Sequence, residues 1–114
     1  RVRHPALPGD PGHALWKRDF SGASGLFSFE IAAVPRAALA AMVDHMAYFG
    51  MGYSWGGFES LILPSDPDPR RSATKWPENS ILIRLHAGLE DPDDLIADLH
   101  AGFERLNSAM SANR

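Results

Sequence analysis

The sequence predicts an α+β fold, in which a small, mostly antiparallel sheet is covered by helices on one face. Three observations predict it. Residues 26–31 and 80–87 alternate between apolar and polar or mixed side chains, as strands do. Residues 91–106 place apolar side chains at helical spacing. The predicted order is strand, helix, strand, strand, helix, which favours helices on one face of the sheet only.

Composition narrows the classes of function. The chain has 114 residues, a net charge of -3 and no cysteine. It is long enough for one domain with a modest core. The charge offers no basic field for nucleic acid or anionic membrane, and without cysteine neither a disulfide nor a thiolate metal site can form. No apolar run is long enough to span a bilayer and no signal peptide is visible, so we expect a cytoplasmic protein.

Residues 1–25 are expected to form an extended inter-domain arm, and residues 26–114 a small α+β domain. The arm is rich in proline and glycine, which favour extended and turn conformations. It also carries Leu7, Leu15, Trp16 and Phe20. A free linker would not expose so much apolar surface, so we expect the arm to pack on a domain outside this chain. The chain starts with Arg1, and we expect it to be a piece of a longer protein.

The first strand is predicted at residues 26–31, followed by a helix after Val34. Pro35 fits the first helical position, where a missing N–H costs nothing. We expect Gly50 and Gly52 to end this helix. Its predicted apolar stripe consists of Leu39, Met42, Val43 and Met46.

The remaining elements follow a turn at residues 53–61. A strand is predicted at 58–63, a long polar loop at 64–79, a strand at 80–87 and a final helix from 92. Asp91 is a good N-cap for that helix, and Pro92 suits its first position. Asp93 and Asp94 complement the positive end of its dipole. Its predicted buried stripe consists of Leu95, Ile96, Leu99, Phe103 and Leu106.

The turn at residues 53–61 is the strongest candidate for a functional site. It combines Tyr53, Trp55 and the adjacent Gly56 and Gly57. Glycine lets the backbone approach another group closely, and tryptophan offers a flat face with one N–H donor. A simple hairpin needs the glycines but not the tryptophan. This combination indicates the edge of a ligand site.

Two polar residues of the strand at 80–87 lie on the same face. Arg84 is interpreted in two ways: it is an arginine on the exposed face of the sheet, with Glu59 on a neighbouring strand as a candidate partner, or its planar fork binds a substrate carboxylate. His86 is interpreted as a structural histidine. A metal site of His86, Glu90 and Asp91 is less favoured, because helix capping already accounts for the acids. No nucleophile elbow, phosphate loop or dinucleotide motif is present.

Two long runs of the sequence resemble a known family. They read FGMGYSWGGFESLILP at residues 49–64 and SILIRLHAGLEDPDDLIADLHAGFERL at residues 80–106. They resemble the C-terminal domain of the cystathionine β-lyases, in the pyridoxal-phosphate-dependent Cys/Met metabolism family of fold type I. The runs HPALP, HALWKRDFSG and GLFS within residues 4–28 resemble its inter-domain segment. The resemblance covers nearly the whole chain.

The resemblance implies a carbon–sulfur lyase that cleaves L-cystathionine to homocysteine, pyruvate and ammonia. Its cofactor, pyridoxal 5'-phosphate, is held by a lysine of a large domain, and the full-length family forms homotetramers. By motif, Arg84 matches the arginine that binds the α-carboxylate of the amino-acid thioether substrate. Ser54 and Trp55 match residues beside that carboxylate and the cofactor lysine, and Tyr53 lines the same pocket.

The resemblance also discriminates within the family and shows what this chain lacks. Tyr53 and Trp55 favour the β-lyase branch, because γ-lyases and γ-synthases have a sequence similar to Glu-Ser-Leu at this turn. A related carbon–sulfur lyase that acts on cysteine or another thioether amino acid is an open alternative.

The only lysines, Lys17 and Lys75, do not lie in the sequence motif that surrounds the family's cofactor lysine. We therefore expect no catalytic residue and no activity in this chain alone. The alternative is a non-catalytic α+β module that binds or senses an amino acid.

Overall fold

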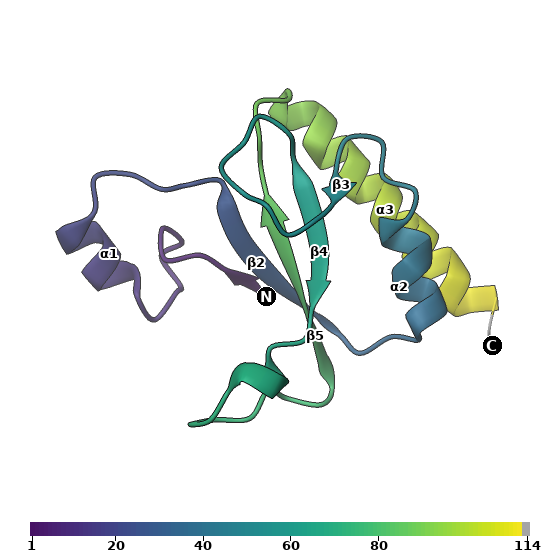
Figure 1. Cartoon of the computed structure of the whole chain (residues 1–114), viewed down its shortest axis with the longest axis horizontal. Coiled ribbons are helices and arrows are strands. Elements are labelled where there is room, and N and C mark those ends of the chain that lie inside the picture. Colours follow the sequence, from purple (N-terminus) through teal and green to yellow (C-terminus); the bar gives the residue numbers. More distant parts are fainter. Residues whose placement is uncertain (113–114) are drawn as a thin grey trace.

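A five-stranded mixed sheet forms the centre of the computed structural model, which describes residues 1–112 (Figure 1). The strand order is β1-β2-β5-β4-β3. The strands are β1 Val2–Arg3, β2 Leu26–Ala32, β3 Gly50–Met51, β4 Leu61–Ser65 and β5 Ser80–His86. The helices are α1 His13–Asp19, α2 Arg36–Val43, the short 3₁₀-helix η1 Asp68–Arg70 and α3 Pro92–Ala112. The predicted α+β fold is confirmed.

All strand pairs are antiparallel except β3 with β4, which confirms the prediction of a mostly antiparallel sheet. A parallel pair of consecutive strands needs a connection that returns to the starting end. Here residues 52–60 make that return, so they form a loop at one end of the sheet. Because these residues build the loop, β4 begins at Leu61 rather than at the predicted residue 58.

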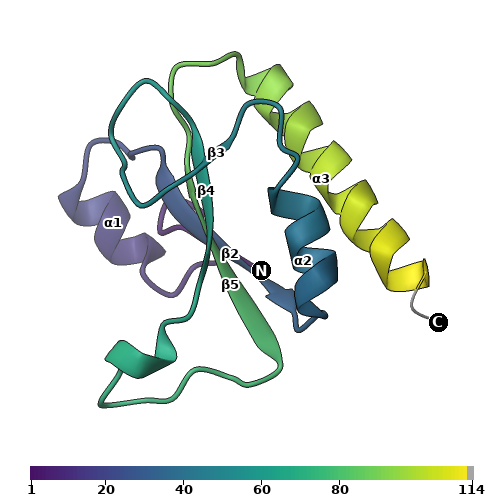
Figure 2. The same ribbon diagram turned by 45° about the vertical axis from the view of Figure 1, so that its right-hand side comes forward.

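Helices α2 and α3 lie side by side on one face of the sheet (Figures 1 and 2). The sheet contributes alternate apolar residues of β2, β4 and β5 to the core beneath them. The buried apolar residues are Phe29, Ala38, Met42, Val43, Phe49, Ile62, Ile83, Leu85, Leu95 and Leu106. The predicted helical layer on one face is therefore confirmed.

Helix α2 is shorter than predicted, and a buried carboxylate explains why. The helix ends at Val43, well before Gly50. Asp98 of α3 is 5% exposed, and its carboxylate accepts the backbone N–H groups of Ala47, Tyr48 and Phe49 at 2.8, 2.8 and 3.1 Å. These donors are satisfied by Asp98 rather than by helical carbonyls, so the chain leaves the helix without a buried unpaired group.

Helix α3 starts as predicted, and its predicted buried stripe is confirmed except at Ile96: Leu95 and Leu106 lie in the core, and Leu99 and Phe103 pack against it. The Asp91 carboxylate accepts the N–H of Asp93 at 2.8 Å, which confirms the cap. Ile96 is 54% exposed, so its predicted burial is wrong. Asp98 and Gly102 are also buried, which the apolar pattern did not predict. A Cβ at Gly102 would lie 3.0 Å from the sulfur of Met46, so glycine lets α2 and α3 approach closely there.

The arm at residues 1–25 was predicted to be extended, but it contains helix α1. No proline or glycine lies between residues 13 and 19, whereas several flank this stretch, so seven residues are free to form two helical turns. Strand β1 adds to the edge of β2. The views in Figures 1 and 2 place α1 away from α2 and α3.

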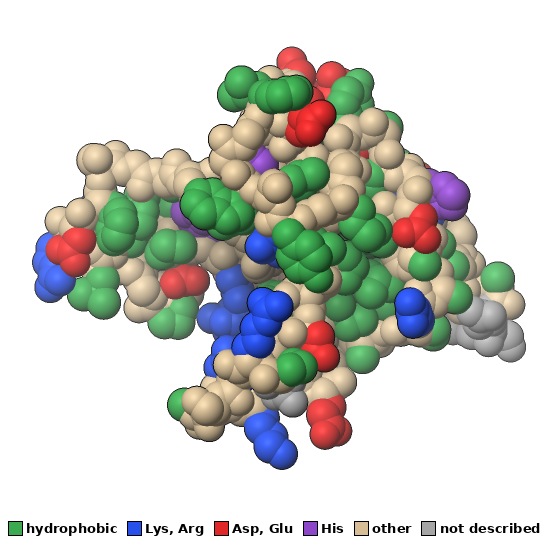
Figure 3. All heavy atoms as spheres, viewed as in Figure 1, with side chains coloured by type: hydrophobic (Ala, Val, Ile, Leu, Met, Phe, Trp, Pro, Cys, Tyr) green, Lys and Arg blue, Asp and Glu red, His purple; other side chains and the backbone are tan. Residues whose placement is uncertain are grey.

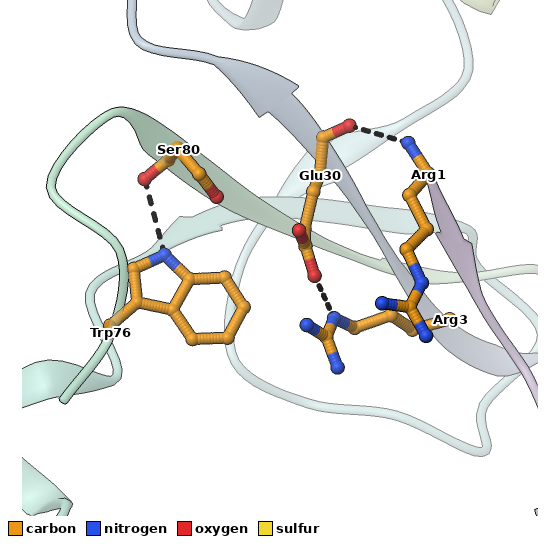
Figure 4. A network of polar contacts seen from close by, with 5 residues as sticks. All are labelled: Arg1, Arg3, Glu30, Trp76 and Ser80. Atoms are coloured by element: carbon orange, nitrogen blue, oxygen red, sulfur yellow. Dashed lines mark hydrogen bonds and ion pairs between the residues drawn. The ribbon is translucent and has the colours of Figure 1, made fainter. Parts of the chain in front are cut away.

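Contacts between β1, β2 and the segment before β5 fix the chain start to the sheet (Figure 4). The amino group of Arg1 donates to the Glu30 carbonyl at 3.0 Å, and Arg3 pairs with the Glu30 carboxylate. The Arg3 guanidinium lies 5.1 Å from the ring centre of Trp76, whose Nε1 donates to the Ser80 carbonyl at 3.1 Å. The predicted loop at 64–79 is thus partly ordered by β4, η1 and Trp76.

None of the helices within residues 1–112 combines the length and the apolar character that crossing a membrane requires.

Candidate functional site

The loop of residues 52–60, which we call the aromatic loop, presents large apolar side chains to solvent. Tyr53 is 74% exposed, Trp55 65% and Phe58 70%. Figure 3 shows separate hydrophobic side chains among backbone and other atoms in this region, with Lys and Arg side chains below them. Apolar groups concentrated in this way mark a surface that another molecule or domain covers.

Arg84 anchors the start of the aromatic loop. It lies in the middle of β5, opposite Ser28 of β2 and Leu63 of β4, on the sheet face away from α2 and α3. Its Nη2 donates to the Tyr53 carbonyl. Among residues 1–112, this is the only hydrogen bond of the Arg84 side chain, and no ion pair joins it to Glu59. The interpretation as an Arg84–Glu59 pair is therefore wrong.

Arg84 keeps donors for an anion. A guanidinium has five N–H groups in a fixed fork, and the Tyr53 carbonyl takes one of them. The side chain is half-buried, so it stands at the surface beside the exposed loop. Such a fork suits a planar carboxylate that approaches from solvent.

His86 anchors the middle of the aromatic loop. It follows Arg84 by two residues, so both side chains leave β5 on one face. The ring is 6% exposed. Its Nδ1 accepts the N–H of Gly56 at 3.3 Å, and its Nε2 lies 3.0 Å from the Gly57 carbonyl oxygen. His86 therefore has a structural role, as predicted, because it holds the aromatic loop.

Ser60 and Glu90 anchor the end of the aromatic loop. The Glu90 carboxylate accepts the Ser60 hydroxyl at 2.6 Å and the Ser60 N–H at 2.9 Å. The hydroxyl in turn accepts the N–H of Gly88 at 2.8 Å. The Ser60 hydroxyl hydrogen bond, followed by backbone bonds, lowers the pKa of Glu90. Glu90 therefore stays ionised at neutral pH and holds the loop.

Of the four site residues that the sequence singles out, the structure brings two, Tyr53 and Arg84, into contact. Tyr53 contributes its carbonyl to Arg84, whereas the side chains of Ser54 and Trp55 are exposed and make no hydrogen bond within residues 1–112. Sequence reasoning missed the roles of Ser60 and Glu90, because serine before a strand and glutamate before a helix carry no pattern that links them.

The described residues, 1–112, do not form an enclosed cofactor site or a metal site. Lys17 lies on α1 and Lys75 on the segment before β5, and both are exposed, so neither offers an enclosed amine to a pyridoxal ring. Glu90 is bound to Ser60 and Asp91 caps α3. In the part of the chain that the structure describes, no three His, Asp or Glu side chains are grouped to hold a metal ion.

Residues 1–104 match the family described as Cys/Met metabolism PLP-dependent enzyme, which is most of the chain. The chain belongs to this family. Its cofactor is pyridoxal phosphate, which this chain's own residues do not enclose. The family assignment confirms the resemblance.

Individual relatives carry different named activities. The chain is 54% identical over 112 residues to the cystathionine beta-lyase of Escherichia coli K12, covering 93% of this chain and 28% of that protein. It is 50% identical over 111 residues to an L-alanine/L-glutamate racemase of Wolbachia pipientis, covering 93% of this chain and 27% of the relative. A cystathionine gamma synthase structure from Xanthomonas oryzae superposes with a TM-score of 0.75 at 34% identity, covering 95% and 29% of the two chains. The chain therefore spans less than a third of these relatives.

Proposed function

We propose that this chain is the C-terminal substrate-binding domain of a pyridoxal-phosphate-dependent carbon–sulfur β-lyase. The full-length protein cleaves L-cystathionine to homocysteine, pyruvate and ammonia. The observation that carries the proposal is the pairing of the half-buried Arg84 fork with the exposed aromatic loop. Family membership favours this proposal over a stand-alone amino-acid-binding module.

In the proposed site, Arg84 binds the substrate α-carboxylate. A charge-assisted, bidentate pair sets both the position and the orientation of an amino acid. Because Arg84 also holds the Tyr53 carbonyl, the loop and the bound carboxylate share one anchor. Ser54 and Trp55, directly after Tyr53, then border the carboxylate and the cofactor lysine of the large domain.

We propose cleavage of L-cystathionine by β-elimination rather than by γ-elimination. Tyr53 and Trp55 replace the smaller or charged residues expected in γ-lyases and γ-synthases. The 54% identity to a protein named cystathionine beta-lyase supports the same choice, compared with 34% for the structure of a cystathionine gamma synthase.

We propose that the large domain and further subunits bury the apolar residues that are exposed in this chain. Residues 1–25 form the proposed inter-domain arm and residues 26–114 the small domain. Leu15 is 57% exposed and Phe20 66% on the arm, as expected for a segment packed between two domains. We place the cofactor lysine in the large domain and expect the full-length protein to be a homotetramer.

Product analysis of the purified full-length protein tests the proposed reaction. With L-cystathionine, α,β-elimination releases homocysteine, pyruvate and ammonia. γ-Cleavage would instead release cysteine and 2-oxobutyrate, and a racemase would convert L-alanine to D-alanine. Pyruvate and homocysteine in equal amounts are expected. Either of the other product sets as the main activity would contradict the proposal.

This chain alone is expected to be inactive. Its two lysines, Lys17 and Lys75, do not lie in the family's cofactor-lysine motif, and both are exposed, so neither offers the cofactor an enclosed amine. The 114-residue chain, shown to be folded by circular dichroism, should release no pyruvate from L-cystathionine with added pyridoxal phosphate. The full-length protein is the positive control. Pyruvate release by the folded chain above the rate of free cofactor would contradict this expectation.

A further inference from the structure

We propose that His86 is a positioning residue that fixes the aromatic loop at Gly56 and Gly57 and so holds Trp55 against the substrate. This inference rests on the proposed function, because it assigns a role within that substrate site. The family resemblance assigned roles to Arg84, Tyr53, Ser54 and Trp55 but none to His86. The evidence is the pair of contacts that the ring makes with the loop backbone.

The contacts determine which ring nitrogen carries the proton. A backbone N–H can only donate, so Nδ1, which meets the N–H of Gly56 at 3.3 Å, is the unprotonated acceptor. The proton of the neutral ring therefore lies on Nε2, which donates to the Gly57 carbonyl at 3.0 Å. One side chain thus satisfies a donor and an acceptor of two consecutive loop residues.

Arg84 and His86 together hold the loop on both sides of Ser54 and Trp55. Arg84 binds the carbonyl of Tyr53, and His86 binds Gly56 and Gly57. Both anchors come from one strand, whose register with β2 and β4 is continuous through these positions. The exposed pair between the anchors is therefore tied to a rigid element, as precise binding sites require.

The loop needs such an anchor because its own backbone is permissive. Gly56 has a φ of +81°, a conformation that glycine adopts freely, and a Cβ at either Gly56 or Gly57 would meet nothing within 4 Å. No packing against neighbours limits the two glycines on that side. The hydrogen bonds from His86 supply the restraint.

Three substitutions in the full-length holoenzyme separate the two contacts. His86→Leu removes both contacts and keeps an apolar side chain in the buried site. His86→Asn keeps an acceptor near the position of Nδ1, and His86→Gln keeps a donor near the position of Nε2. His100→Leu is the matched control, because His100 is exposed on α3.

The expected kinetic result is a split between KM and kcat. His86→Leu should raise the KM for L-cystathionine about tenfold, the equivalent of one lost net hydrogen bond, with kcat within about threefold of wild type. His86→Asn or His86→Gln should recover part of the KM. His100→Leu should change neither parameter. An unchanged KM in His86→Leu would overturn the proposal, as would loss of kcat alone.

Hydrogen exchange of the ligand-free full-length protein gives a readout that does not depend on activity. Peptides covering residues 53–58 should exchange about tenfold faster in His86→Leu, whereas peptides covering β5 and α3 should not change. Equal acceleration in β5 would show a general structural role and overturn the proposal, and so would an unchanged loop. If the wild-type protein does not cleave L-cystathionine, the proposed function fails, while the exchange data still decide whether His86 holds the loop.

Discussion

Replacing Arg84 with alanine in the full-length protein is expected to raise the KM for L-cystathionine by about 30- to 900-fold. This range corresponds to about 2–4 kcal/mol, the usual cost of removing one partner of a desolvated charge pair. The value of kcat should fall much less, because the carboxylate is bound in both ground and transition states. Steady-state kinetics measures both parameters.

The same substitution also removes the hydrogen bond to the Tyr53 carbonyl, so its two effects must be separated. A substrate-like amine without the α-carboxylate should bind wild type and Arg84→Ala with similar affinity if Arg84 acts on the carboxylate. Arg84→Lys keeps the charge but not the fork and should lie between the two. Arg36→Ala, at an exposed position on α2, is the matched control. An unchanged KM in Arg84→Ala would remove Arg84 from the substrate site.

Replacing Gly88 with alanine is expected to have the largest effect on the loop and on stability. A Cβ at Gly88 would lie 2.7 Å from the carbonyl carbon of Phe58 and 2.8 Å from that of Glu59, and these backbone atoms cannot rotate away. The clash would strain two hydrogen bonds: the one from the Gly88 N–H to the Ser60 hydroxyl at 2.8 Å, and the one from the Leu89 N–H to the Phe58 carbonyl at 2.9 Å. We expect a loss of about 3 kcal/mol in the free energy of unfolding, at the upper end for overpacked sites.

Urea denaturation of the 114-residue chain measures that loss, and kcat/KM of the full-length protein measures displacement of the loop. Gly22→Ala is the matched control, since a Cβ at Gly22 would meet nothing within 4 Å. Stability and kcat/KM of Gly88→Ala equal to those of the control would contradict the close contact between Gly88 and the aromatic loop.

Local signals in the sequence predicted those parts of the fold that depend on neighbouring residues. Alternation at residues 26–31 and 80–87 predicted β2 and β5, and the Asp91 cap predicted the start of α3. The end of α2 could not be predicted, because it depends on Asp98, more than fifty residues away in sequence from Val43. Hydrophobic periodicity identified Leu95, Leu99, Phe103 and Leu106 on the buried side of α3, but it could not identify Asp98 and Gly102, because a carboxylate and a glycine carry no apolar signal.

The candidate site divides in the same way. The aromatic residues and Arg84 could be singled out from residue type and resemblance, and the structure brings Tyr53 to Arg84. The loop partners of His86 and the pairing of Ser60 with Glu90 could not be found, because these groups come close only in the folded chain. Contacts between residues about thirty positions apart leave no spacing rule in a sequence, unlike the local cap at Asp91.

In the proposed site, Arg84 binds the α-carboxylate of an amino-acid substrate beside the aromatic loop. A crystal structure of the full-length holoenzyme with an unreactive analogue of L-cystathionine tests it most directly. The expected result is a bidentate contact between the guanidinium of Arg84 and both carboxylate oxygens, at about 2.7–2.9 Å, with Trp55 alongside. A carboxylate bound by other residues, with Arg84 contacting only the Tyr53 carbonyl, would contradict the proposed role of Arg84.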